Sequence, residues 1–306
     1  MSRNPTEYRK PTAWMIACAT IALTSLAVVA RQNPPAKTLS VVTEQPKGEA
    51  FRTPEGAAAA LYTAARRNDE NELLTILGPS AKNLVNWTDD PNQRAEQRKA
   101  FVEKYEQLHR LVKEPDETVA LYVGAENWPV PIPIVQYEGK WYFDADLGGQ
   151  EVLFRRIGRN EMEALQVCEA LVDAEKEYYA GEHKYTAIFI SDGESHSGLY
   201  WKASANGKNS PIGPYLAHAG MDSNHGTSEP YYGYYYRILL KPNSSARGEG
   251  SFAVLAFPAE YRSSGVKTFF IEQDGVAHEK DLGSNTAEQA KQMGASKPDS
   301  SWSEVE

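Results

Sequence analysis

The chain has 306 residues and a formal net charge of −9 at neutral pH. An acidic protein is a poor match for nucleic acid or for an anionic lipid surface, because both attract basic patches. Only two cysteines are present, Cys18 and Cys168, so a zinc site built on cysteines is excluded. We therefore expect a fold that is stabilised by burial, and the length is sufficient for two domains.

The N-terminus predicts export. Residues 1–10 carry three basic side chains, and residues 13–30 contain no charge and end in Val28-Val29-Ala30. This pattern is typical of a secretory signal peptide over residues 1–30, with cleavage after Ala30. The apolar run is also close to the length of a membrane span, so an uncleaved anchor over residues 13–30 is the alternative. Both interpretations predict a protein of the periplasm or cell envelope.

Residues 31–50 are polar and contain prolines, which predicts a linker. A first domain is expected over residues 51–147 and begins with three helices, the first of which starts with Thr53 as its cap and Pro54 in its first turn. The expected helices are a segment from Thr53 to about Asn68, Glu70–Leu77 and Asn92–Val112. Antiparallel strands rich in β-branched and aromatic residues follow over residues 117–124, 129–139 and 140–146. This order is similar to the curved-sheet cone of the nuclear-transport-factor-2-like (NTF2-like) superfold.

A second domain is expected over residues 148–302. Apolar residues recur at helical spacing in a long helix over Gln150–Tyr179. Strand-like segments follow over residues 184–191, 233–241, 251–261 and 266–282, the last with an Asp274-Gly275 hairpin signal. A long helix before an antiparallel meander resembles the globular head of type IV pilin-like proteins. The predicted fold class of the whole chain is α+β.

The stretch "EPYYGYYYRILL" at residues 229–240 is the most aromatic part of the chain. Because side chains alternate along a strand, one face is expected to carry Tyr232, Tyr234 and Tyr236, and the other Tyr235. The helix stripe from Met162 to Val172 needs an apolar surface to cover it. We therefore predict that the tyrosine row is structural and is not a ligand-binding strip.

Several long motifs in a fixed order resemble one known family. They include "NWPVPIPIVQYEGKWYFDADLGGQEVLFRRIGRNEMEALQVCEALVDAEKEYYA", "SPIGPYLAHAG", "YYGYYYRIL", "FAVLAFPAEYRSSGVKTFFIEQDGVAHEKDLGSNT" and "KPDSSW". Together they are similar to an exported bacterial family called domain of unknown function 2950, over residues 51–302. The resemblance implies an envelope location, but it implies no reaction and no site residues.

Two groups of residues are candidates for a pocket in the predicted cone. Trp87, Trp128 and Tyr142 would supply an aromatic lining, although filling the core is the commoner use of such side chains. Asp144 and Asp146 follow a strand at the predicted mouth of the cone, where paired carboxylates can act as a general base. The same two residues are equally typical of a turn that ends a strand.

A basic cluster and two polar loops complete the candidates. Arg155, Arg156 and Arg159 can bind an anion or a partner carboxylate, or form a solvated helix face paired with nearby glutamates at 151, 161 and 163. Metal ligation by the loop residues His218, Asp222 and His225, and hydrolysis by Ser195 beside His196, have no supporting pattern. Neither a metal nor another cofactor is therefore expected, and no catalytic residue is assigned.

From these features we predict a non-catalytic binding or interaction module of the envelope. The alternative is a carrier of a small ligand, or an enzyme, that uses a pocket near Asp144 and Asp146. The expected partner is an envelope protein or a small ligand, and membrane contact is expected only through an uncleaved N-terminal segment.

Overall fold

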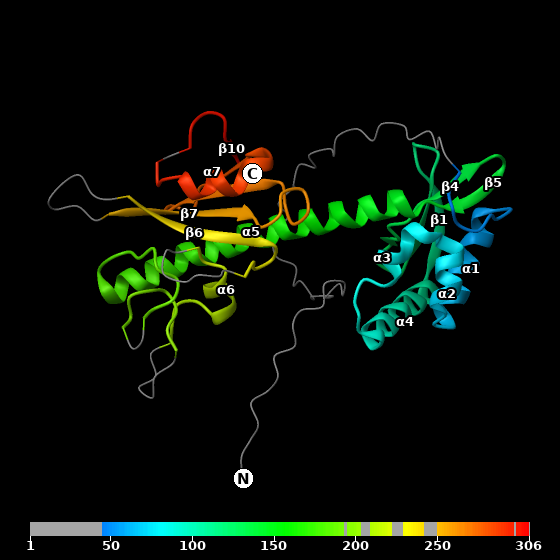
Figure 1. Ribbon diagram of the computed structural model, residues 1–306, viewed down its shortest axis with the longest axis horizontal. Coiled ribbons are helices and arrows are strands. Elements are labelled where there is room, and N and C mark those ends of the chain that lie inside the picture. The colour runs from blue at the N-terminus through cyan, green and yellow to red at the C-terminus, as the bar shows by residue number, and fades with distance from the viewer. Residues whose placement is uncertain are drawn as a thin grey trace, which may run out of the picture. The chain divides into compact units, whose positions relative to one another are not determined.

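A computed structural model describes residues 45–192, 195–202, 209–221, 229–241, 250–296 and 298–305. These residues form two compact units that divide between Val152 and Leu153 (Figure 1). Each unit packs helices against an open antiparallel sheet, so the fold class is α+β, as predicted. The predicted signal peptide and most of the predicted linker lie outside the described residues.

The first unit begins with helices and ends with a sheet. Its elements are α1 (Pro54–Arg66), α2 (Glu70–Leu77), η1 (Pro79–Ala81), α3 (Lys82–Val85), α4 (Pro91–Gln107), β1 (His109–Lys113), β2 (Val119–Val123), β3 (Trp128–Pro129), β4 (Ile134–Tyr137) and β5 (Lys140–Phe143). The strands follow the order β1-β2-β4-β5, and β3 pairs with β2. The prolines around β3 and β4 keep these strands short, because proline cannot donate to a ladder.

Side-chain caps begin α1, α2 and α4, and the cap at Thr53 is the predicted one. Thr53 Oγ1 accepts the Gly56 N–H at 3.1 Å before α1, Asp69 Oδ1 accepts the Glu72 N–H at 3.0 Å before α2, and Asp90 begins α4 in the same way. The buried faces of α1, α2 and α4 meet the sheet in one core, which includes Leu61, Ile76 and Leu121. The caps and this core fix the helices over one face of the sheet.

One predicted helix is too long. The apolar spacing predicts α4 up to Val112, but the helix ends at Gln107 and residues 109–113 form β1. Leu111 lies opposite Leu121 of β2, and the two strands pair along their length. Pairing with the next strand, β2, overrides the local helical pattern.

The segment before α1 is tied to the sheet. Phe51 exchanges two backbone hydrogen bonds with Trp141 of β5, at 2.8 and 2.9 Å. The Glu49 N–H also donates to the carbonyl of Ile76 in α2, at 3.2 Å. The chain from Glu49 onward therefore belongs to the folded unit.

The second unit is one long helix, a sheet and short helices. Its elements are α5 (Ala145–Glu182, which begins in the first unit), α6 (Pro214–His218), β6 (Tyr234–Lys241), β7 (Ser251–Pro258), β8 (Lys267–Glu272), β9 (Ala277–Asp281), η2 (Gly283–Asn285), α7 (Thr286–Gln292) and β10 (Ser303–Glu304). The strand order is β10-β9-β8-β7-β6, all antiparallel. The helix is longer at both ends than the predicted Gln150–Tyr179.

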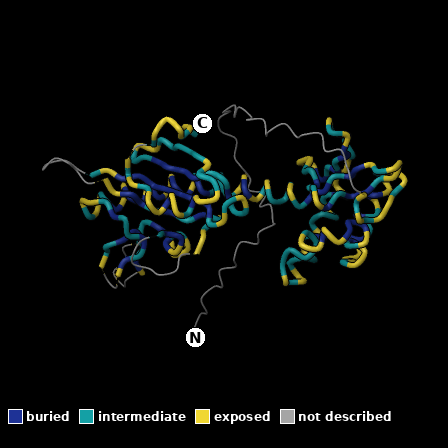
Figure 2. The backbone as a smooth tube through the Cα atoms, turned by 45° about the horizontal axis from the view of Figure 1, so that its top comes forward, coloured by how far each residue is buried: buried dark blue, intermediate teal, exposed yellow. Residues whose placement is uncertain are grey.

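Both faces of the second sheet are covered, and Figure 2 shows buried positions along its strands. Tyr234, Tyr236 and Ile238 lie in one core with Cys168 and Leu171 of α5. The opposite face carries a second core, in which Leu255 and Phe270 pack with Ala290 of α7. The prediction that the tyrosine row is structural is thus confirmed for Tyr234 and Tyr236.

Two details of that prediction are wrong. Tyr232 is 38% exposed and lies in a tight turn between Tyr231 and Tyr234, where it and Gly233 both have positive φ angles, of 50° and 75°. Such a two-residue turn favours glycine at its second position. Met162 is 57% exposed, because the buried stripe of α5 runs through Ala164 and Val167 instead.

The predicted strand at residues 184–191 does not form. Its backbone donates to side chains: the Thr186 N–H to Glu175 Oε2 at 3.2 Å, and the Ile188 N–H to Thr186 Oγ1 at 3.1 Å. An isolated parallel bridge joins Ile190 to Tyr200. There the Tyr200 N–H donates to the Phe189 carbonyl and the Ser191 N–H to the Tyr200 carbonyl, each at 2.8 Å. Further along the chain, Ala219 and Met221 exchange backbone hydrogen bonds with Tyr236, on the outer side of β6.

Candidate functional site

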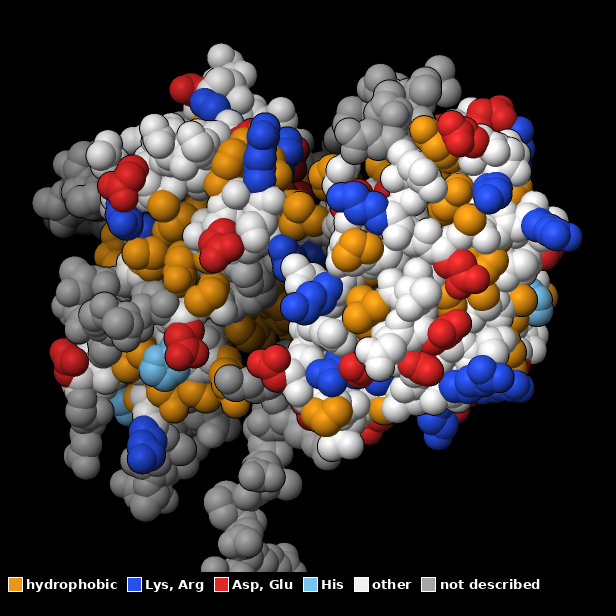
Figure 3. All heavy atoms as spheres, turned by 45° about the vertical axis from the view of Figure 1, so that its right-hand side comes forward, with side chains coloured by type: hydrophobic (Ala, Val, Ile, Leu, Met, Phe, Trp, Pro, Cys, Tyr) orange, Lys and Arg blue, Asp and Glu red, His pale blue; other side chains and the backbone are white. Residues whose placement is uncertain are grey.

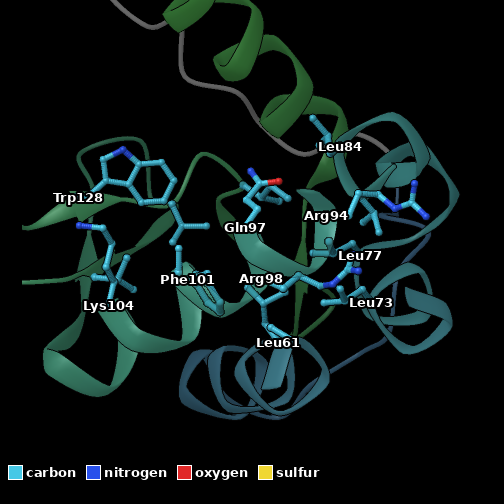
Figure 4. Close-up of a pocket in the computed structure, with 16 residues that line it drawn as sticks. Leu61, Leu73, Leu77, Leu84, Arg94, Gln97, Arg98, Phe101, Lys104 and Trp128 are labelled. Atoms are coloured by element: carbon cyan, nitrogen blue, oxygen red, sulfur yellow. The ribbon is translucent and has the colours of Figure 1, made fainter. Parts of the chain in front are cut away.

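The first unit contains a mostly apolar cavity of about 230 Å³. It lies between the helices and the sheet, and Figure 4 shows the side chains around it. Its lining consists of Leu61, Ala65, Leu73, Leu77, Leu84, Val85, Arg94, Gln97, Arg98, Ala100, Phe101, Lys104, Val123, Trp128, Val130 and Ile132. Leucines from α1, α2 and α3 form one side, and Trp128 of β3 lies on another.

All four polar side chains of the lining come from α4. Successive members of this group are spaced so that they share one face of the helix with Phe101. The group consists of Arg94, Gln97, Arg98 and Lys104. The other face of α4 is exposed at Glu96 and Lys99. The helix therefore presents a polar ridge to an otherwise apolar cavity.

The two arginines are held in place by α2 and its flanks. Glu70 Oε1 accepts from Arg94 Nε at 2.9 Å and from Arg98 Nη2 at 3.0 Å. Arg94 Nη1 also donates to the Thr88 carbonyl at 2.6 Å, and Arg98 Nε donates to Asn68 Oδ1. The hydrogen bond from Arg94, with support from Arg98, holds the pKa of Glu70 below its usual value of 4.5.

Lys104 is held in a similar way. Its Nζ lies 3.0 Å from Glu126 Oε2 in the turn after β2. The Glu126 backbone N–H and Lys104 together lower the pKa of the Glu126 carboxyl. The cavity thus combines apolar walls with cations that pair with carboxylates outside the lining.

The comparisons with known proteins identify the family of this chain. A family model described as "Protein of unknown function (DUF2950)" matches residues 48–305. This chain belongs to that family. The match covers both units, including the cavity. No curated protein and no solved structure matches the chain, so the likeness of the halves to NTF2-like and pilin-like folds stays a prediction.

The structure separates the residues that sequence reasoning placed in one pocket. Trp128 lines the cavity, whereas the lining does not include Trp87, Tyr142, Asp144 or Asp146. Tyr142 is buried, and its hydroxyl accepts a hydrogen bond from Gln45 Nε2 at 3.3 Å. Trp87 is half-buried, after α3.

The two aspartates lie at the start of α5. Asp144 Oδ1 accepts the N–H groups of Asp146 and Leu147, at 3.1 and 2.9 Å, which is the geometry of a helix cap. Asp146 is exposed in the first turn of the helix. The Asp144 side chain therefore caps the helix.

The basic cluster lies in the second unit. Arg155, Arg156 and Arg159 belong to α5, and Arg156 Nη2 is 3.4 Å from Ser263 Oγ. Glu161 accepts the backbone N–H groups of Val266 and Lys267, at 2.9 and 3.0 Å. On the face seen in Figure 3, basic and acidic side chains are intermingled.

The polar loops show no arrangement of catalytic or metal-binding type within the described residues. Ser195 Oγ donates to the Asp192 carbonyl at 2.6 Å, while the His196 ring stacks on Trp201, 4.3 Å between centroids. His218 is exposed in α6, and Asp222 and His225 lie outside the described residues. The part of the chain that the structure describes contains no group of three potential metal ligands.

No described helix combines the length and apolar character needed to cross a bilayer.

The second unit contains a buried carboxyl group. Glu175 of α5 is fully buried; its Oε2 accepts the Thr186 N–H, while its Oε1 has no hydrogen bond among the described residues. Burial raises the pKa of Glu175 to about 8.

Sequence reasoning did not find Glu70, Arg94, Gln97, Arg98 or Lys104. The charges of α4 had no role assigned from the sequence, and nothing in the sequence indicates that Glu70 contacts them. The spacing of Arg94, Arg98 and Phe101 on one helical face was the available signal.

Proposed function

We propose that this protein is a non-catalytic binding protein of the cell envelope, and that its first unit binds a small, mostly apolar molecule. The observation that carries the proposal is the cavity of about 230 Å³ between the helices and the sheet. Ligand sites are typically concave and mostly apolar, with a few fixed polar groups. Drug-sized ligands occupy pockets of roughly 300–1,000 Å³, so the expected ligand is smaller than these.

The envelope location is supported by the N-terminal sequence. Its basic start, apolar middle and small residues before Arg31 are typical of an export signal. An uncleaved anchor over residues 13–30 is the alternative within the same proposal. An enzyme that uses Asp144 and Asp146 is less favoured, because Asp144 is engaged in capping α5.

Calorimetric titration with 1-octanol tests the binding function, because this alcohol is small, apolar and uncharged. We expect saturable binding to the purified protein at one site. The variant Ala100→Phe should abolish this binding, because Ala100 lines the cavity and the added ring would fill it. Ala59→Phe is the matched control, since Ala59 is exposed on α1.

The proposal fails if neither 1-octanol nor its carboxylate analogue octanoate binds, or if Ala59→Phe lowers the affinity as much as Ala100→Phe. Both variants must first show the circular dichroism spectrum of the parent. Native mass spectrometry of protein from its own envelope would complement the titration by giving the mass of any bound molecule.

A further inference from the structure

The polar side chains that line the cavity are almost all hydrogen-bond donors. Arg94, Arg98 and Lys104 offer only N–H groups, and the amide oxygen of Gln97 is the one side-chain acceptor of the lining as described. A ligand that satisfies this lining must therefore bring acceptors. Carboxylates are strong acceptors and form short, charge-assisted bonds with guanidinium groups.

The charge around the cavity is also unbalanced. Three cations line it, and the two carboxylates that bind them, Glu70 and Glu126, are not part of the lining. One positive charge is left in excess at the walls. Attraction to an anion is stronger in such a partly dry, apolar site than in water.

Three of the lining residues keep donors that make no hydrogen bond within the described part of the chain. Arg94, Gln97 and Arg98 lie within about one turn of α4. Arg94 Nη2, Arg98 Nη1 and the Gln97 amide make no hydrogen bond among the described residues. Figure 4 shows Gln97 between Trp128 and Leu84. The Lys104 ammonium, in contrast, already has Glu126 as its counterion.

Building on the small-ligand function proposed above, we propose that the ligand is a small amphipathic monocarboxylate. Its carboxylate lies beside Gln97, within reach of Arg94 and Arg98, and its apolar body lies along Phe101 and Trp128. Leu73 and Leu77 lie beside the arginines and add apolar surface to the lining (Figure 4). The lining therefore selects the ligand by both shape and charge.

Three probes with the same eight-carbon chain test the ligand class: octanoate, 1-octanol and octylamine. Titrations at pH 7.5 should give an affinity for octanoate at least about tenfold higher than for 1-octanol, with octylamine the weakest. The difference between octanoate and 1-octanol should shrink as salt is added, because ions screen partly exposed charges.

The outcomes separate the two proposals. Equal affinities for octanoate and 1-octanol, or a preference for octylamine, would overturn the carboxylate inference while leaving the small-ligand function intact. If neither octanoate nor 1-octanol binds, the small-ligand function fails and the inference fails with it.

Two variants test the position of the carboxylate. Gln97→Leu should lower the affinity for octanoate about tenfold and leave that for 1-octanol unchanged. Gln93→Leu is the control, because Gln93 lies on α4 but outside the lining, and it should change neither affinity.

Lys104→Met tests the other end of the cavity. It should alter the affinity for octanoate by no more than about twofold, because Glu126 already neutralises that end. Loss of the octanoate preference in Lys104→Met, but not in Gln97→Leu, would refute this placement.

Discussion

Tyr234 and Tyr235 are neighbours in β6 but face different cores. Tyr234 is fully buried, and its hydroxyl donates to the Lys267 carbonyl at 2.9 Å. Its ring lies against Gly265, where any side chain would collide with it. Tyr235 is only half-buried against the second core.

Tyr234→Ala should destabilise the protein by about 3–5 kcal/mol, because it removes a buried ring and leaves a cavity. Tyr235→Ala should cost about 1–2 kcal/mol, because less of its ring is buried. Urea unfolding of both variants measures the difference. A free energy of unfolding for Tyr234→Ala that equals or exceeds that for Tyr235→Ala would contradict its place in the core.

Glu175 predicts a dependence of stability on pH. Its pKa in the folded protein is raised from 4.5 to about 8, so the folded state retains a proton that the unfolded state loses. The free energy of unfolding should therefore fall as pH rises from 4.5 to about 8, by up to ~1.4 kcal/mol per pH unit. Glu175→Gln mimics the protonated group and should remove this slope.

The measurement is urea unfolding of the parent and of Glu175→Gln at pH 5, 6.5 and 8. The variant should be the more stable of the two at pH 8 and close to the parent at pH 5. Glu169→Gln, at an exposed position of the same helix, is the control. Parallel profiles for parent and Glu175→Gln would show that burial does not hold the proton on Glu175.

At the scale of elements, Glu70 joins α2 to α4 through two arginines. Glu70→Gln should lower the free energy of unfolding at pH 7 by about 1 kcal/mol, a modest value because the carboxylate is 31% exposed. The folded pKa of Glu70 is lowered, so its charge stabilises the fold above pH 4.5 and this contribution is lost as pH falls below that value. The difference should therefore shrink at pH 3.

Glu72→Gln is the control for this prediction, because Glu72 is exposed in the same helix. Urea unfolding at both pH values measures the effect. A difference between Glu70→Gln and the parent that is as large at pH 3 as at pH 7 would exclude the charge of Glu70 as its cause.

The elements that sequence predicts well have strong local signals. Thr53-Pro54-Glu55 and the Asp69 cap begin helices that form as expected, and the alternation along β6 predicts which tyrosines are buried. Residues 109–113 and 184–191 are different, because hydrogen bonds to another segment of the chain decide their conformation. The partner is the strand β2 in the first case and side-chain oxygens in the second. Local propensity does not contain that information.

The candidate site was less predictable than the fold. Trp128 could be proposed from its type and its place beside the strands, and it lines the cavity. The ion pairs that fix Arg94 and Arg98 depend on Glu70, which only tertiary packing brings to α4. Without an observed spatial neighbour, a charged side chain on a helix is indistinguishable from a solvated one.

At the scale of the whole molecule, the proposed export predicts a processed N-terminus. Protein isolated from the envelope should begin at Arg31 and dissolve without detergent, because the apolar run ends at Ala30. N-terminal sequencing and fractionation measure this directly. Peptides that begin at Met1, in a membrane pellet that resists high salt, would establish the anchored form instead.

The backbone hydrogen bonds of Phe51 and of residues 219–221 cover two sheet edges, and this affects how readily the protein self-associates at high concentration. The outermost strand of an open sheet is a template on which other chains can pair, and proteins protect such strands in order to stay soluble. Phe51 covers part of β5, and Ala219 and Met221 cover part of β6. The outermost strand at the other end of the second sheet, β10, is two residues long, exposed and contains Glu304. Proteolysis that removes Phe51 would uncover β5 and favour self-association, even with every helix and the cavity intact.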